Sequence, residues 1–352
     1  MDTKQKKWLW ISIGLSIVIL LVVMILTFNE NTIESLKNLN PWFLLLAFSL
    51  HMTAMCIWAL RIQIMCKSLG YPVPLWHCLN MICAGQLIAS VTPSQIGGEP
   101  VRIHELYKAK VPITDAMIVI LIERLMDAVL LVLGVVVGMC LFSIAYSNEE
   151  IPGMVITAAW ISTGFFVMLL TILAMLLSRP QIIRKIVFKI AEFFTKKWDS
   201  KKIEKLTLRI DETINRLYMT FETFANRAKI GLVFGFLLTI LFWACEYAIA
   251  SVLLIGLDYP PNFLLSLVFQ LIIAMILMIP TTPGGAGVAE ISYAAFYSLI
   301  LPSAVVGVFV VLLRLILYYS NLLIGFVASF LIVRREATNE VVEVEPKEGE
   351  AI

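Results

Sequence analysis

Residues 90–100 read SVTPSQIGGEP and residues 279–290 read IPTTPGGAGVAE, and these two stretches decide how the chain folds. Each contains a Thr-Pro step, a Gly-Gly pair and then a glutamate, and each interrupts a long apolar run, which covers 76–109 or 263–301. Proline and glycine end helices, so each run is expected to form a helix, a break and a second helix. Each arm has roughly 13–18 residues, fewer than the ~20 that a spanning helix needs. We therefore expect two re-entrant hairpins, each entering and leaving the membrane on one side.

The composition of the chain is that of an integral membrane protein. Of its 352 residues, 60% are hydrophobic and 15% are charged, whereas soluble domains have about 45–50% apolar and about 25% charged residues. A chain with so few polar groups cannot cover its own surface in water. The net charge of +2 gives no reason to expect nucleic acid as a partner. The six cysteines show no CxxC pair or zinc-ligand spacing, so we expect no disulfide framework, no metal site and no cofactor.

Six further apolar runs reach or nearly reach the ~20 residues of a membrane span. They are 8–28, 42–60, 114–145, 154–178, 230–256 and 303–333. We therefore predict an all-α polytopic membrane protein with about six full transmembrane helices and two re-entrant helical hairpins. A single membrane domain is expected over 1–335. The acidic tail, 336–352, has no aromatic residues and is expected to be disordered.

The distribution of lysine and arginine predicts the orientation. With the N-terminus in the cytoplasm, the cytoplasmic segments include Arg61, Lys67 and the thirteen basic residues of 179–229, whereas the external loops carry only Lys37. This distribution follows the positive-inside rule and places both termini in the cytoplasm. Re-entrant hairpins and full double crossings leave the same loops inside, so charge does not separate those two models.

The basic segment 179–229 has apolar residues at helical spacing. We expect amphipathic helices that lie on anionic lipid headgroups. A docking surface for a partner is the alternative.

The two interrupted runs indicate an internal repeat. Arg124 follows Thr92 by 32 residues, and Arg314 follows Thr282 by the same number. Upstream of the breaks, a Trp-Ala-x-charged pattern occurs in both halves, ending at Arg61 in one and at Glu246 in the other. Three such matches in the same order favour a repeat over chance.

The predicted repeat units are 42–145 and 230–333, and the span 154–178 between them reverses the direction of the second unit. Inverted repeats with broken helices that meet near the membrane midplane are the architecture of secondary transporters. Re-entrant loops that serve only as packing elements are the alternative.

Charged residues occur at membrane depth. Glu123, Arg124 and Asp127 lie in one span, and each would cost ~2.5–3.5 kcal/mol if it faced lipid. They must therefore face protein, water or a ligand, and Arg124 is spaced to pair with Asp127. Glu246 and Arg314 also fall at mid-depth. A closed structural ion-pair network is the alternative to a ligand site.

Arginine and glycine-rich breaks both suit an anionic group. The guanidinium stays charged and binds phosphate through two hydrogen bonds, and backbone N–H groups at the start of a half-helix bind anions. Each break is therefore a candidate phosphate cradle, through Gly97 and Gly98 or through Gly284, Gly285 and Gly287. Glu99 and Glu290 would cap their own half-helices or receive a cationic headgroup, and Arg102 would neutralise Glu99.

Three stretches carry a resemblance to a known family: SVTPSQIGGEPVRIHELY (90–107), VILIERLMDAVLLVLG (119–134) and IPTTPGGAGVAEISYAAFY (279–297). In this order they resemble the lysylphosphatidylglycerol synthase transmembrane region family, the UPF0104 group, which is similar to the flippase domain of bacterial multiple-peptide-resistance factors. The resemblance covers roughly 8–335. The family's motif positions fall on Thr92, Pro93, Gly97, Gly98, Glu99, Arg102, Glu123, Arg124, Asp127, Pro283, Gly284, Gly285, Gly287, Glu290 and Arg314.

The resemblance implies a protein of the prokaryotic cell membrane that moves a lipid between leaflets. We expect these motif residues, together with Glu246 and Thr282, to bind the substrate, a phospholipid or a polyprenyl-phosphate lipid. No GxxxxGK[ST] motif is present, so we expect a flippase or scramblase that does not hydrolyse ATP.

We do not expect an enzyme. The resistance factors carry a large soluble aminoacyl-transferase domain after the membrane part, whereas this chain carries a short acidic tail, so we expect no synthesis of lysyl-phosphatidylglycerol. The three histidines form no catalytic pattern, and His51 and His77 are expected to be packing or interfacial residues. A membrane-embedded glycosyltransferase acting on polyprenyl phosphate is the alternative. The sequence is compatible both with a monomer and with a homo-oligomer.

Overall fold

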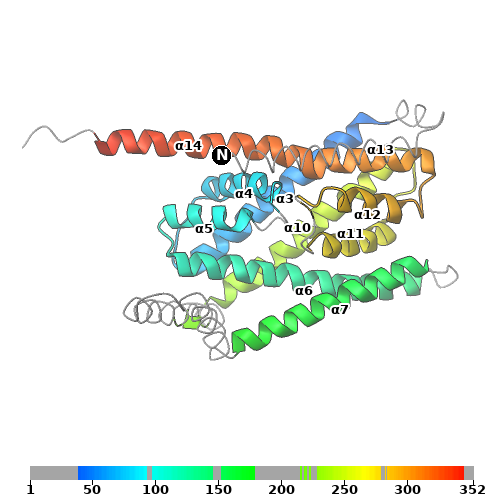
Figure 1. Ribbon diagram of the computed structural model, residues 1–352, viewed down its shortest axis with the longest axis horizontal. Helices are drawn as coiled ribbons and strands as arrows, with labels where there is room; N and C mark the ends of the chain where they lie inside the picture. Colours follow the sequence, from blue (N-terminus) through cyan, green and yellow to red (C-terminus); the bar gives the residue numbers. More distant parts are fainter. Residues whose placement is uncertain are drawn as a thin grey trace, which may run out of the picture.

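The computed structural model describes residues 39–92, 97–145, 152–178, 228–278, 282 and 284–344, together with the isolated residues 215, 218, 219 and 222. These residues form helices, turns and short connections, with no strand among them (Figure 1). The elements are α3 (Pro41–Ser68), α4 (Leu75–Ala89), α5 (Gly98–Lys108), α6 (Ile113–Ala145), α7 (Gly153–Ser178), α10 (Lys229–Gly256), α11 (Phe263–Met278), α12 (Val288–Tyr297), α13 (Ser303–Arg314), the π-helical turn η1 (Leu315–Tyr319) and α14 (Ser320–Val344).

Five of the described units are long and apolar enough to cross a membrane: α3, α6, α7, α10 and the continuous unit α13–η1–α14. They coincide with five of the six predicted spans. The predicted span 8–28 lies outside the described residues, as does nearly all of 179–229. The outer faces carry exposed apolar side chains, such as Trp160 and Ile161 of α7, which suit contact with lipid. The protein is a multi-pass membrane protein.

Both interrupted runs form two short helices, as the Pro and Gly residues predict. The first contains α4 and α5, of 15 and 11 residues, and the second contains α11 and α12, of 16 and 10 residues. At 1.5 Å per residue, even α4 and α11 are only about 22–24 Å long, which is shorter than the ~30 Å hydrocarbon core. The helix–break–helix expectation is confirmed, and the side from which each hairpin enters the membrane stays a prediction.

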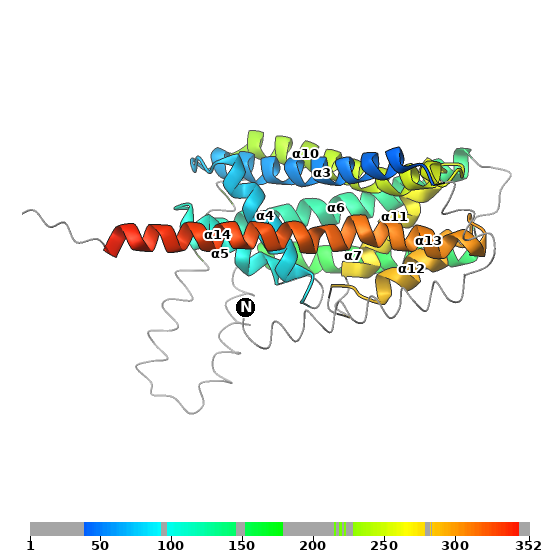
Figure 2. The same cartoon turned by 90° about the horizontal axis from the view of Figure 1, so that it is seen from above.

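The packing joins the two halves of the chain. Helices α3 and α10 run side by side, α4 packs against α14, and α11 packs against α6 (Figures 1 and 2). Small residues allow these close approaches. A Cβ on Gly325 of α14 would lie 2.5 Å from the carbonyl oxygen of Cys83 in α4, and a Cβ on Gly134 of α6 would lie 2.9 Å from Leu271 of α11.

Helix α3 is longer than the sequence predicts. Asn40 caps its start by accepting a hydrogen bond from the Trp42 N–H group at 3.1 Å. The helix then continues to Ser68, and Gly70, with φ of 92°, turns the chain. The expectation that the span ends at residue 60 and leaves Arg61 in a cytoplasmic loop is wrong, because no proline or glycine precedes Gly70 in this stretch. Arg61 is fully buried inside the bundle.

Side-chain hydrogen bonds connect the C-terminal part of α14 to the first hairpin. Arg335 donates hydrogen bonds to the Glu105 carboxylate at 2.9 Å and to His77 Nδ1 at 2.8 Å. Because arginine only donates, His77 Nδ1 must accept, and its Nε2–H then donates to the Glu105 backbone oxygen at 2.9 Å. Arg335 therefore links α14 to both α4 and α5.

The acidic tail is not disordered from its first residue. Helix α14 continues to Val344, so the expectation of disorder is wrong for 336–344. Extending an existing helix fixes one residue for each hydrogen bond gained, so a helix that is already formed can continue into a stretch whose own helix propensity is modest. Residues 345–352 lie outside the described part of the chain.

Candidate functional site

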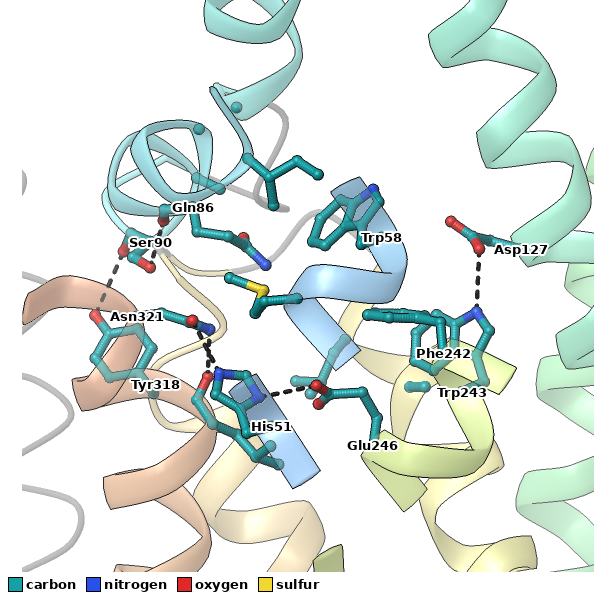
Figure 3. Close-up of a pocket in the computed structure, with 18 of the residues that line it drawn as sticks. His51, Trp58, Gln86, Ser90, Asp127, Phe242, Trp243, Glu246, Tyr318 and Asn321 are labelled. Atoms are coloured by element: carbon teal, nitrogen blue, oxygen red, sulfur yellow. Dashed lines mark hydrogen bonds and ion pairs between the residues drawn. The ribbon is translucent and has the colours of Figure 1, made fainter. Parts of the chain in front are cut away.

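A cavity of about 520 Å³ lies inside the bundle (Figure 3). Its walls come from α3, α4, α5, α6, α10, α11, α12, α13, η1 and α14, so both hairpins and both halves of the chain contribute. The volume falls within the roughly 300–1,000 Å³ that small-ligand sites occupy. The lining is aromatic and apolar over much of its surface, with Trp58, Phe242 and Trp243 close to charged groups.

The two helix breaks touch each other beside this cavity. The Gly284 N–H donates to the Thr92 carbonyl oxygen at 3.2 Å. Gly284, Gly285 and Gly287 have φ values of 59°, 67° and 87°, a region that side chains other than glycine rarely adopt. The glycine-rich sequence is thus required by the tight turn that brings the second break against the first.

Several of the glycine N–H groups that we expected to cradle phosphate are already paired. Gly97 donates to Thr92 Oγ1 at 2.9 Å, Gly285 to the Thr282 carbonyl at 3.1 Å, and Gly287 to Glu290 Oε2 at 2.7 Å. The last bond confirms that Glu290 caps its own half-helix. In this conformation these groups, like Gly284, would bind phosphate only after giving up an internal acceptor.

One group of charges at the wall of the cavity forms a buried ion-pair network. Arg61 lies between Glu123, at 3.0 Å, and Asp127, at 2.7 Å, and Arg102 forms a close ion pair with Glu123. Trp58 Nε1 donates to Glu123 at 3.0 Å. Arg61 and Glu123 are fully buried. This part of the polar set matches the structural network that the sequence left open as an alternative.

The expected pairing of these residues needs correction. Arg102 forms its ion pair with Glu123, so Glu99 is not its direct partner. Arg124 lies 3.7 Å from Asp127, so the expected i,i+3 pair exists, but its shorter contacts are to Glu99, at 2.5 and 2.9 Å. The spacing of the sequence predicts the Arg124–Asp127 pair, because two residues three apart on one helix share a face. It does not predict the Arg124–Glu99 pair, because Glu99 lies on another helix, α5.

Arg124 and Arg314 line the same cavity from opposite halves of the chain. Arg124 is the twelfth residue of α6 and Arg314 the twelfth of α13, so each lies about 17 Å along its helix. Arg314 Nε lies 2.9 Å from Glu290, and its guanidinium carbon lies 4.0 Å from the ring centre of Tyr318. Each arginine is therefore paired with the glutamate that follows the Gly-Gly pair of its own half.

The turn after Arg314 is a π-helix, which widens the helix by one residue at this point. Such π-turns occur mostly as single turns and often at functional sites. Here it places Tyr318 beside Arg314 and lets the Tyr318 hydroxyl lie 3.4 Å from the Ser90 carbonyl oxygen. The sequence shows no signal for this turn.

His51 is buried in the bundle, as a packing residue would be, and its ring also makes two polar contacts that the sequence did not predict. Its Nδ1 lies 2.8 Å from Glu246 Oε1, and its Nε2 lies 3.0 Å from Asn321 Oδ1 (Figure 3). These three residues come from α3, α10 and α14, and all of them line the cavity. Sequence reasoning found Glu246 through its depth and missed His51, which contacts Glu246, and Asn321, which contacts His51, since a lone histidine or asparagine in a span shows no pattern.

The structure brings some of the expected site residues together and leaves others aside. Those that line the cavity are Gly98, Glu99, Arg102, Arg124, Asp127, Glu246 and Arg314. Those that lie in the breaks or behind the lining are Thr92, Gly97, Glu123, Thr282, Gly284, Gly285, Gly287 and Glu290. Pro93 and Pro283 lie outside the described residues. Residues that line the cavity and were not expected include Arg61, Gln270, Tyr293 and Asn321.

Comparison with known proteins identifies the family. The family model of the lysylphosphatidylglycerol synthase TM region matches residues 9–325. A UPF0104 membrane protein of Archaeoglobus fulgidus is 31% identical over 327 residues, which is 90% of this chain and 95% of the relative. A second, of Methanocaldococcus jannaschii, is 26% identical over 329 residues, 92% of this chain and 94% of the relative. No solved structure matches the chain. The buried charges and broken helices described above lie within the matched range, and the chain belongs to the family of the lysylphosphatidylglycerol synthase transmembrane region.

Proposed function

We propose that this protein moves a phosphate-bearing membrane lipid between the two leaflets without hydrolysing ATP. The observation that carries the proposal is the pair of arginines, Arg124 and Arg314, that reach one cavity from the two halves of the chain. Each contacts a glutamate of its own hairpin, Glu99 for Arg124 and Glu290 for Arg314. Ionisable residues at membrane depth are functional candidates in themselves, because they are costly there.

The chemistry of the two arginines suits a phosphate. A guanidinium binds phosphate oxygens through two parallel hydrogen bonds. The Arg124 side chain is 37% exposed, so it is accessible to a ligand that enters the cavity. Glu99 and Glu290 hold the arginines, and a lipid phosphate would replace these carboxylates. The cavity accommodates a headgroup, and the acyl or prenyl chains would stay in the surrounding lipid.

The packing pattern supports an inverted repeat. The first hairpin packs against the last unit of the second half through α4 and α14, and the second hairpin packs against the last helix of the first half through α11 and α6. The two long first helices, α3 and α10, lie against each other. This reciprocal arrangement is expected from a pseudo-two-fold axis, around which transporters of this architecture alternate access to a fixed site. With the N-terminus in the cytoplasm, Arg124 would serve one face and Arg314 the other.

The test is lipid movement in proteoliposomes. Purified protein is reconstituted with a trace of fluorescent phosphatidylglycerol, and a membrane-impermeant reductant bleaches the outer-leaflet label. We expect the wild type to expose the inner-leaflet label, and Arg124→Ala and Arg314→Ala to slow that exposure more than ten-fold. Arg334→Ala, an exposed arginine of α14 outside the cavity, is the matched control.

A second measurement addresses the enzyme alternative. The same preparation is incubated with radiolabelled sugar nucleotides and polyprenyl phosphate. Formation of a glycosylated lipid by the wild type, without movement of any labelled lipid between leaflets, would replace the translocase proposal with a glycosyltransferase.

A further inference from the structure

The cavity contains a histidine–glutamate pair, His51 and Glu246, that the phosphate site does not explain. His51 Nδ1 faces the Glu246 carboxylate at 2.8 Å, and His51 Nε2 faces the Asn321 side-chain oxygen at 3.0 Å. The orientation of the Asn321 amide follows from its other contact, because its Nδ2 donates to the Leu317 carbonyl at 2.8 Å. Oxygen acceptors therefore face both nitrogens of the imidazole.

This geometry requires two protons on the pair. One hydrogen must lie on Nε2, which donates it to the Asn321 oxygen. A second hydrogen must lie between Nδ1 and the Glu246 oxygen, bonded either to the nitrogen or to the oxygen. If the second proton leaves, a nitrogen lone pair faces a carboxylate at 2.8 Å, and the contact becomes repulsive. The arrangement of α3, α10 and α14 at this point is therefore linked to the binding of one proton.

The charges around the cavity give this proton an electrostatic role. The cluster contains four arginines and five carboxylates: Arg61, Arg102, Arg124, Arg314, Glu99, Glu123, Asp127, Glu246 and Glu290. These charges leave one negative charge, and the shared proton of His51 and Glu246 cancels it. Away from bulk water, uncompensated charges interact strongly, so the protonated cluster accepts an anionic phosphate more readily than the deprotonated one.

Other charged and titratable groups reach the cavity near His51 from several elements. Glu246 and Tyr247 line the cavity from α10, Arg124 and Asp127 from α6, and Tyr318 from η1. The cavity residues of α4 are uncharged, and Arg314 of α13 is held by Glu290. Asp127 is 2.7 Å from Arg61 and Arg124 is 2.5 Å from Glu99, so both are compensated by another residue. Glu246 is thus the carboxylate that His51 contacts directly.

We propose that His51 and Glu246 bind one proton that travels with each anionic lipid, so that lipid movement is driven by the proton gradient. This inference rests on the translocase proposal and adds its energy source. The proton enters from water on the face where the lipid phosphate is bound and leaves to water on the other face when the phosphate leaves. A lipid with one negative charge and one proton together carry no net charge, so the step responds to a pH gradient and not to membrane voltage.

The experiment uses the full chain in proteoliposomes with a trace of fluorescent phosphatidylglycerol and a pH-sensitive dye in the lumen. A gradient of one pH unit is imposed while the voltage is clamped with potassium and an ionophore. For one proton per lipid, this gradient sustains up to about a ten-fold ratio of labelled lipid between the leaflets. We expect the wild type to approach that ratio, with proton entry seen by the dye, and His51→Gln to move lipid only to an equal distribution. His104→Gln, an exposed histidine of α5, should behave as the wild type.

The outcomes separate the two proposals. If the wild type moves no labelled lipid with or without a gradient, the translocase proposal is wrong. If the wild type equilibrates the lipid but the gradient shifts nothing, only the proton coupling is overturned. Should His51→Gln not be recovered as folded protein, Glu246→Gln tests the same pair, and a gradient-driven ratio that survives in that variant also overturns the coupling.

Discussion

The Nε of Arg314 lies 2.9 Å from the carboxylate of Glu290, which in turn accepts a hydrogen bond from the Gly287 N–H group. This one carboxylate therefore caps the second half-helix of its hairpin and holds the arginine of the following span. Anything that draws Arg314 away from Glu290 takes a cation away from a buried carboxylate, which is costly at membrane depth. The position of the second hairpin and the availability of Arg314 are linked through this contact, and Glu99 holds Arg124 in the first half.

The two arginines are expected to contribute comparably to lipid movement. Arg124→Lys and Arg314→Lys keep the charge and lose the two-pronged guanidinium, so each should slow transport by a similar factor. The alanine variants should slow it by about 10–100-fold, the equivalent of one lost charge-assisted hydrogen bond. Rates of label exposure in proteoliposomes measure both. Normal transport by Arg314→Ala beside an inactive Arg124→Ala would replace the two-site model with a single cavity open to one face.

The buried ion-pair network of Arg61, Arg102, Glu123 and Asp127 is expected to contribute to the free energy of unfolding. Arg61→Met removes the buried cation between Glu123 and Asp127 and leaves Asp127 with Trp243 and the more distant Arg124, so it should lower the free energy of unfolding by about 3–5 kcal/mol. The double variant with Asp127→Leu removes both partners and leaves Glu123 paired with Arg102, so it should recover most of the loss. Thermal unfolding in detergent measures these values. Equal losses in the single and double variants would show that the Arg61–Asp127 contact does not contribute as a pair.

The contribution of the Arg335 hydrogen bonds to the packing of α14 on the first hairpin should be measurable by hydrogen exchange. Arg335→Ala removes the bonds to His77 and Glu105, and exchange should quicken in α4 and α5. Because Arg335 is 40% exposed, the loss of stability should be only about 1 kcal/mol. Its neighbour Arg334, changed to alanine, is the control. Unchanged exchange in α4 and α5 would mean that the glycine contacts alone hold α14 there.

A hydrogen bond in the loop after α3 gives a prediction about pH. The Tyr71 hydroxyl donates to Asp115 at 2.6 Å, and this bond raises the pKa of Tyr71 to about 12. The pKa in the unfolded chain is about 10, so the stabilisation is fully present below about pH 10 and is lost as the pH rises through about 12. Tyr71→Phe should therefore cost about 1 kcal/mol at pH 6 and the same at pH 9. A cost that differs between these two pH values would contradict the assignment.

The sequence by itself determined the membrane class, five of the spans that the structure describes and both helix breaks. These features depend on local physics: an apolar run of sufficient length forms a spanning helix, and Thr-Pro followed by glycines ends one. The equal spacing from Thr92 to Arg124 and from Thr282 to Arg314 also pointed to two arginines in related positions, and both line the cavity.

The tertiary structure alone decided which charges meet. Arg61 looked like the end of a span because it is the charged residue that follows the apolar run 42–60, and only the packing of α3 against α10 and α6 shows it buried between Glu123 and Asp127. Likewise, the contact of His51 with Glu246 joins residues 195 positions apart. Helical periodicity assigns a residue to a face of its own helix. It does not say which face of another helix lies opposite, because helix crossings are set by close packing of small residues and by the need of each buried charge for a partner.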